Sequence, residues 1–114
     1  MQKYTPSSLF AGEYPIVTQS IKIAQGQQLS KGALLGRIET SNQYVLSNAT
    51  AKDGSKLPSV VLAEDVDALQ GEVNAVCYLS GQFNTNALTF GDGHTPQSVT
   101  NHLRQLNIYL TNTI

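Results

Sequence analysis

One cysteine and two histidines are the side chains of this sequence best suited to nucleophilic or acid–base catalysis. Such catalysis needs a nucleophile, a base and a group that orients the base, all within hydrogen-bonding reach. Cys77 lies inside an apolar run, so we interpret it as a packing residue. His94 falls in a Gly-rich turn and His102 on a predicted helix, and the sequence assembles no triad around either. A small enzyme built on His94 and Asp92 remains an alternative.

Three carboxylates close in sequence, Glu64, Asp65 and Asp67, could bind a divalent cation or act as an acid–base pair. Glu64 and Asp65 are adjacent at the end of an apparent strand, where neighbouring side chains point in opposite directions. No loop with calcium-type spacing completes a ligand shell. We therefore interpret the three as a solvated turn, with an enzyme using the Glu64 and Asp65 pair as the alternative.

Glycines at positions 26, 32 and 36 give residues 26–40 the composition of a phosphate-binding loop. Their spacing matches neither established phosphate-binding motif, and no helical pattern follows that could present its N-terminus. Gly in a protein of short strands usually marks turns with positive φ. We predict a tight turn at Lys31 and Gly32, and a close backbone approach at Gly36. The sequence predicts no cofactor.

The element that must organise these residues is the apolar run of residues 73–79, which ends at Ser80 and Gly81. Both of its sides are apolar, whereas a strand with one face in water alternates apolar and polar residues. We therefore predict a strand covered on both faces, central in a sheet or small barrel. A second run, residues 60–63, leads through the acidic turn into it.

Shorter strands are predicted around this central one. β-branched and apolar runs indicate strands at residues 16–23, 34–38, 44–46 and 108–110, with a hairpin between the second and third. Residues 47–58 form a polar loop with a turn at Asp53 and Gly54.

A single helix is predicted near the C-terminus. Thr95 is a preferred N-cap, Pro96 suits the first helical position, and apolar residues follow at helical spacing. Ser98 is neither Glu nor Gln, so the capping box should be incomplete. The expected fold is mainly β with one short C-terminal α-helix, in a small β-barrel or sandwich-like domain.

Composition restricts the partners. The chain has 114 residues, enough for one domain with its own core, and one cysteine excludes an internal disulfide. A net charge of −1 with seven scattered Lys and Arg argues against nucleic acid, and the apolar stretches are too short to span a membrane. No signal peptide is recognisable, so we expect synthesis and retention in the cytoplasm. Ser, Thr, Asn and Gln make up about a third of the residues, a neutral surface suited to protein contacts.

The first 15 residues show neither helical nor alternating periodicity, yet they are rich in large apolar side chains. One interpretation is a frayed terminus. The other is an arm that becomes ordered on a partner by adding backbone hydrogen bonds to a sheet edge. The candidate contact residues of this arm are Tyr4, Pro6, Leu9, Phe10, Tyr14 and Pro15.

Three segments in a characteristic order carry a resemblance to a known family. They are residues 26–38 (GQQLSKGALLGRI), 62–67 (LAEDVD) and 75–84 (AVCYLSGQFN). Their order and spacing, over about residues 12–110, resemble the head decoration protein family of tailed bacteriophages, typified by the lambda capsid decoration protein. The resemblance implies the lambda-type decoration fold, with residues 1–15 as a capsid-binding arm and residues 16–114 as a β-rich decoration domain.

The resemblance also implies a function without catalysis. Members form homotrimers on the outer surface of the expanded phage head, at local three-fold positions, and brace the major capsid protein against internal DNA pressure. The N-terminal segment meets the shell and adds to its β-structure. A carbohydrate- or host-surface-binding β-module displayed on the virion is the alternative, since its composition would be equally rich in neutral polar residues.

Overall fold

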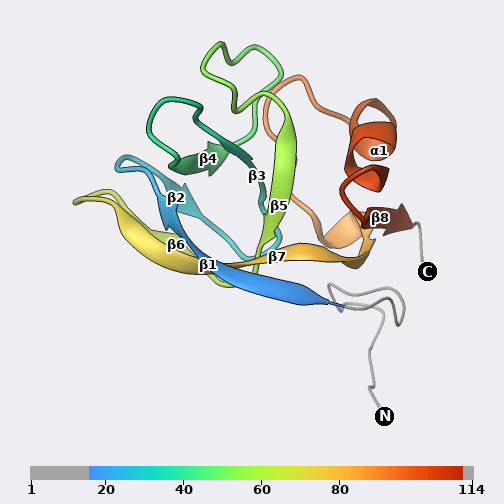
Figure 1. The fold of residues 1–114 in the computed structure, drawn as a ribbon, viewed down its shortest axis with the longest axis horizontal. Helices are drawn as coiled ribbons and strands as arrows, with labels where there is room; N and C mark the ends of the chain where they lie inside the picture. The colour runs from blue at the N-terminus through green and yellow to red at the C-terminus, as the bar shows by residue number, and fades with distance from the viewer. Residues whose placement is uncertain (1–15, 112–114) are drawn as a thin grey trace.

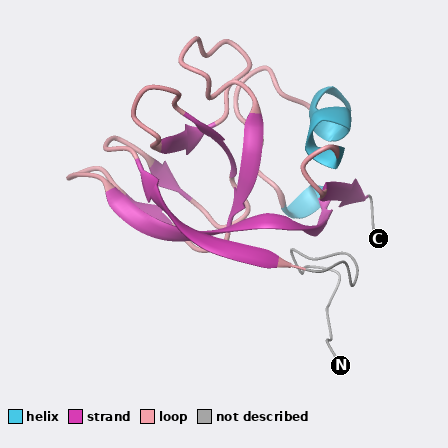
Figure 2. Ribbon diagram, in the orientation of Figure 1, coloured by secondary structure: helices cyan, strands magenta, loops and turns pink. Residues whose placement is uncertain are grey.

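The computed structural model describes residues 16–111, which fold mainly into β-strands with one short α-helix near the C-terminus (Figures 1 and 2). This confirms the predicted fold class. The elements in chain order are β1 (Val17–Ile23), β2 (Gln28–Leu29), β3 (Leu34–Arg37), β4 (Tyr44–Leu46), β5 (Pro58–Leu62), β6 (Val66–Asp67), β7 (Val73–Asn84), the 3-10 helix η1 (Thr85–Ala87), α1 (Pro96–Arg104) and β8 (Ile108–Thr111).

Five of the strands close into a barrel in the order β1-β4-β3-β5-β7, with β1 and β7 completing the ring. The β1–β7 ladder is antiparallel and runs from Val17 opposite Ser80 to Ile23 opposite Val73. Strand β7 also pairs with β5 and, beyond Gly81, with β8 in parallel. The predicted central position of the 73–79 strand is therefore confirmed.

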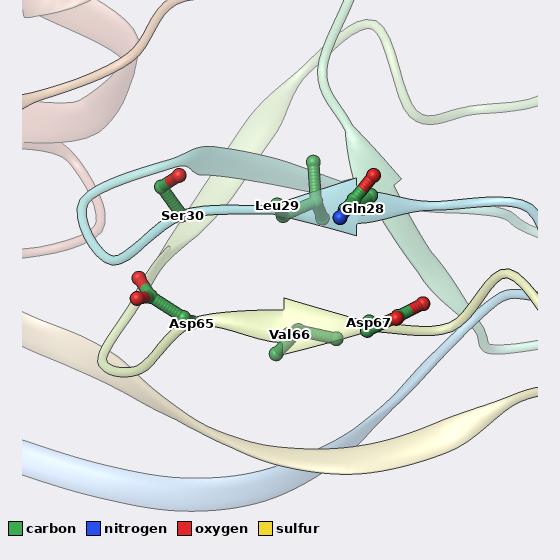
Figure 3. A pocket seen from close by; sticks show the side chains of 6 residues that line it. All are labelled: Gln28, Leu29, Ser30, Asp65, Val66 and Asp67. Atoms are coloured by element: carbon green, nitrogen blue, oxygen red, sulfur yellow. The ribbon is translucent and has the colours of Figure 1, made fainter.

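A two-stranded ribbon of β2 and β6 lies outside the barrel sheet (Figure 3). Gln28 pairs with Asp67 and Leu29 with Val66. Residues 64–67, predicted only as a turn, thus contain a short strand. Two-residue strands carry no alternation pattern long enough to read from sequence, which is why the ribbon was not predicted.

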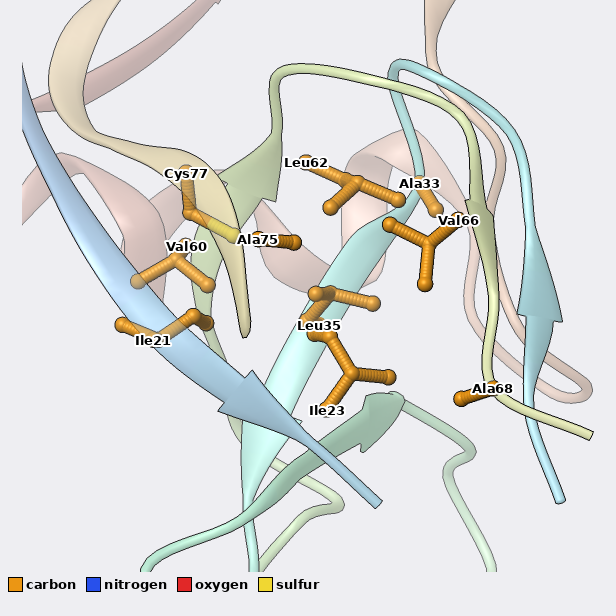
Figure 4. Close-up of a cluster of buried hydrophobic side chains, with 10 residues drawn as sticks. All are labelled: Ile21, Ile23, Ala33, Leu35, Val60, Leu62, Val66, Ala68, Ala75 and Cys77. Atoms are coloured by element: carbon orange, nitrogen blue, oxygen red, sulfur yellow. The ribbon is translucent and has the colours of Figure 1, made fainter. Parts of the chain in front are cut away.

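Two hydrophobic cores are separated by the walls of β3 and β5. One lies inside the barrel and includes Ile23, Leu35, Val60, Leu62 and Cys77 (Figure 4). The other packs beneath helix α1 and is formed by Leu34, Val61, Phe83, Leu88, Val99, Leu103 and Ile108. Successive side chains of a strand point to opposite faces, so each of these two strands supplies both cores.

The prediction that residues 73–79 are covered on both faces holds at Tyr78, which packs against the core beneath α1, but is wrong at Asn74 and Val76. Val76 is 40% exposed and Asn74 is exposed, while Ala75 and Cys77 face the barrel core. Helix α1 packs against β5 and β8, and the core beneath it reaches Tyr78 of β7 but not Asn74 or Val76. The prediction that the strand ends at Gly81 is also wrong. Gly81 adopts φ +147, and the strand continues to Asn84 because β8 pairs with residues 81–84.

Helix α1 begins as predicted, with Thr95 at the N-cap and Pro96 at the first position. The predicted incomplete capping box is wrong. The Ser98 hydroxyl accepts the Thr95 backbone N–H at 2.9 Å, and the Thr95 hydroxyl accepts the Ser98 N–H at 3.1 Å. A serine hydroxyl can therefore fill the role that usually belongs to Glu or Gln. Among residues 16–111, no helix has the length and apolar character that crossing a membrane requires.

Gly36 places the long loop against the barrel. An added Cβ at Gly36 would lie 2.0 Å from the Ser55 carbonyl oxygen, which confirms the predicted close approach. The loop turns at Gly54, with φ +101, and Asp53 accepts hydrogen bonds from the Ser55 N–H and hydroxyl. The hydrogen bond from the Ser55 hydroxyl, followed by that from its N–H, lowers the pKa of Asp53.

Candidate interaction surfaces

Cys77 is fully buried in the barrel core, which confirms its interpretation as a packing residue. Burial, with a smaller contribution from the charge of Glu64, raises the pKa of the thiol to about 12. Because the thiolate is the reactive form, this cysteine is inert near neutral pH.

The structure places His94 beside Ser47, a neighbour that the sequence did not suggest. The His94 Nε2 atom lies 3.2 Å from the Ser47 hydroxyl and 2.9 Å from the Lys56 carbonyl oxygen. A carbonyl only accepts, so this contact requires the hydrogen on Nε2, and that nitrogen then cannot take a proton from Ser47. Ser47 is also fully buried. The pair therefore links the 47–58 loop to the turn before α1 instead of forming a nucleophile and base.

The three acidic residues each accept a hydrogen bond from a different backbone N–H group. Glu64 accepts the Val76 N–H at 2.8 Å, Asp65 the Lys31 N–H at 2.8 Å, and Asp67 the Leu69 N–H at 3.0 Å. All three are exposed. Within residues 16–111, no three His, Cys, Asp or Glu side chains gather as a metal site would require. Each carboxylate accepts a different backbone N–H, and the one that Glu64 accepts belongs to Val76 inside β7.

Large exposed apolar side chains lie in three regions of the described chain. Val17 and Val76 lie on the paired strands β1 and β7, which we name the β1–β7 ribbon, and Ile16 directly precedes β1; the three are 37–51% exposed. Leu57 and Leu106 line one hollow beside α1, and Leu69 lies by itself in the loop after β6. Exposed apolar residues that gather on one surface mark contact sites for partners.

Within residues 16–111, one edge of β1 has no strand partner in the first of these regions. The Val76 carbonyl accepts the Ala63 N–H at 2.9 Å and the Val76 N–H donates to Glu64, so both groups of Val76 point away from β1. Ser20, which lies opposite Val76, is therefore in a non-hydrogen-bonded pair. The backbone groups of Ser20, and by alternation those of Thr18, point outward.

No described strand covers this edge before Ile23, where β4 forms its single pairing with β1. Residues 16–20 are all exposed, and they include no charge and no proline, the usual protections of a sheet edge. An extended segment of another chain could therefore add as a strand here. The sequence signalled the strand, but which of its edges is unpaired follows only from the topology.

The predicted arm residues lie outside the described residues. Residues 1–15 precede β1 in the sequence and contain all six of them: Tyr4, Pro6, Leu9, Phe10, Tyr14 and Pro15. Their contact role therefore stays a prediction.

A comparison with curated proteins found no match to this chain. A comparison with family models found one that matches residues 1–109 and is described as bacteriophage lambda head decoration protein D. That family consists of structural capsid decoration proteins. Because the match spans nearly the whole chain, this protein belongs to the bacteriophage lambda head decoration protein family and is a phage head decoration protein, a component of the virion capsid.

Proposed function

We propose that this decoration protein binds as a homotrimer to the outer surface of the expanded phage head, at local three-fold positions, and stabilises the head against internal DNA pressure. Its partner is the major capsid protein, and neither nucleic acid nor membrane is bound. The protein is made in the host cytoplasm and joins the head there. The family match over residues 1–109 carries this proposal, because it includes the arm as well as the barrel.

The proposed capsid-binding region is the arm of residues 1–15 together with the β1 edge that follows it. Outward-pointing backbone groups of Thr18 and Ser20 support strand addition by a capsid segment, and exposed Ile16 and Val17 add apolar contact. We propose that the arm adds further contacts with the capsid through Tyr4, Pro6, Leu9, Phe10, Tyr14 and Pro15.

Trimeric binding makes a modest contact durable. Once one arm is attached, the other two bind at high effective concentration, provided that their sites are correctly spaced. We therefore expect preference for the expanded head over the unexpanded one, because expansion changes that spacing. Purified protein mixed with both forms should occupy mainly the expanded heads, and equal occupancy would contradict the geometric requirement.

Deletion of residues 1–14 tests the arm. The barrel and its cores are built from residues 16–111, so the shortened chain should keep the circular dichroism spectrum and melting behaviour of the full chain. It should no longer sediment with expanded heads. Undiminished sedimentation would show that the arm is not part of the capsid-binding region.

A pair of proline variants tests the β1 edge separately. Ser20→Pro removes an N–H that points away from β7, whereas Gln19→Pro removes one directed at β7, opposite Cys77. We expect Ser20→Pro to stay folded and bind heads weakly, and Gln19→Pro to lose stability. A folded Ser20→Pro variant that decorates heads like the parent chain would refute strand addition at this edge.

A further inference from the structure

A trimer needs two different contact surfaces on each copy. Three identical chains in a closed ring join one surface of each copy to another surface of the next, because only a two-fold contact pairs a surface with itself. The two surfaces must then complement each other in charge and shape. The described residues present two candidate surfaces, one near each end of β5.

The first surface, which we name the basic groove, runs between the 47–58 loop and helix α1. It consists of two hollows of about 320 and 290 Å³ that share Glu39, Gly54 and Leu57. Leu57 and Leu106 line it, at 53% and 37% exposure. The other residues that define the groove here are Arg37, Lys52, Lys56 and His102. Three Lys or Arg side chains against one carboxylate give the groove a positive charge.

The second surface, which we name the acidic ribbon, comprises β6 and its flanks: Asp65, Val66, Asp67 and Leu69. It borders a hollow of about 490 Å³ on the β2–β6 pair, where Asp65 and Asp67 line opposite ends of β6 (Figure 3). Residues 64–72 contain four acids, of which Glu72 pairs with Lys22, and no Lys or Arg. Leu69 follows as an apolar side chain that is 49% exposed.

We propose that the acidic ribbon of one copy inserts into the basic groove of the next copy and so closes the trimer. The inference rests on the proposed function, which supplies the trimer. Asp65 and Asp67 would meet Lys52 and Lys56, while Leu69 would pack between the two leucines of the groove.

In the described part of the chain, Asp65 and Asp67 accept backbone N–H groups but form no ion pair, and neither Lys52 nor Lys56 forms one. Among residues 16–111, the ion pair that forms is Lys22 with Glu72, at 3.1 Å, and it lies beside the ribbon and not in the groove. The large exposed apolar residues divide between these two surfaces and the β1–β7 ribbon. Because the β1–β7 ribbon is assigned to the capsid, the remaining three leucines are left for contacts between copies.

Disulfide trapping on decorated heads tests the contact. A chain with both Leu57→Cys and Leu69→Cys places one new thiol on each surface, and buried Cys77 does not compete. Mild oxidation of decorated heads should yield covalent trimers on non-reducing gels, whereas either single-cysteine variant should not. A head population that binds the double variant but yields only monomers would overturn the assignment of these surfaces.

Charge reversal in the same double-cysteine chain gives a second reading. Asp67→Lys should abolish most of the covalent trimer, and adding Lys52→Glu and Lys56→Glu should restore it. Asp92→Lys, an equal charge change outside both surfaces, is the matched control and should leave trapping unchanged. Equal trapping in Asp67→Lys and its parent would contradict the charge pairing.

A general amine cross-linker separates this inference from the proposed function. If it yields trimers on heads while the engineered cysteines do not, the trimer stands and the proposed contact is wrong. If it yields no trimers on decorated heads, the trimeric mode of binding itself fails, and the contact with it.

Discussion

Substitution of Gly36 by alanine should destabilise the barrel more than any change of comparable size on its surface. The new Cβ would lie 2.0 Å from the Ser55 carbonyl oxygen, 2.7 Å from its carbonyl carbon and 2.9 Å from its Cα. All three are backbone atoms, so no side-chain rotation relieves the clash. Ordinary contact begins near 3.4 Å, which means that the 47–58 loop must move by more than an ångström.

The energetic cost follows from what that loop contributes. Ser55 is 1% exposed, and Pro58 at the start of β5 pairs with Gly36 across a register shift. Forcing extra volume into a packed site typically costs 1–3 kcal/mol, and a rigid backbone neighbour places this site at about 2–3 kcal/mol. At about 4 °C per kcal/mol for a domain of this size, the melting temperature should fall by roughly 8–12 °C.

Gly71→Ala provides a matched control, because an added Cβ at Gly71 meets nothing within 4 Å. It should change stability by less than about 1 kcal/mol, and a slight gain is expected from reduced freedom of the unfolded chain. Urea and thermal unfolding, followed by circular dichroism at one fixed protein concentration, measures both variants. Equal midpoints for Gly36→Ala and Gly71→Ala would refute the close approach.

Three further predictions concern the cores and the helix. Leu103→Ala empties a fully buried site beneath α1 and should cost about 2–5 kcal/mol in urea unfolding; a loss below about 1 kcal/mol would show that the site collapses freely. Thr95→Ala removes one half of the capping box and should cost about 1 kcal/mol, with Gln97→Ala in the same first turn as a near-neutral comparison. Cys77 should resist thiol reagents at pH 8 until the chain unfolds. The pKa of Cys77 in the folded chain, about 12, exceeds its ordinary value of 9.0, so the free energy of unfolding should decline as the pH rises from 9 towards 12. The decline should be less steep in Cys77→Val than in the parent chain, and equal slopes in the two chains would disprove the pKa shift.

The sequence predicts a residue's role correctly where that role depends mainly on neighbouring residues in the chain. The Thr95 N-cap, Pro96 and the turn at Gly32 follow from short-range stereochemistry, and each is present in the structure. The burial of Cys77 followed from the apolar run around it. The one local error, at Ser98, came from applying a residue preference where the chemistry needs only a hydrogen-bond acceptor.

Errors in the central strand have a different origin. Val76 lies in an apolar run, yet the helix that could cover it packs against β5 and β8 instead. Gly81 predicts the end of the strand, but β8 pairs with residues 81–84 and the strand continues. Both outcomes depend on segments far away in the sequence.

The amino-acid sequence by itself determined the class of this protein: a β-rich domain with one capped helix, a cysteine used for packing, and an ordered set of motifs typical of head decoration proteins. Only the tertiary structure decided which edge of β1 the described strands leave unpaired, and that Ser47 contacts His94. It also decided that the leucines and charges outside the cores divide among separate surfaces. Strand pairing and the closure of a barrel bring together residues that no local spacing relates, because side-chain periodicity specifies the face of a strand and not its neighbour.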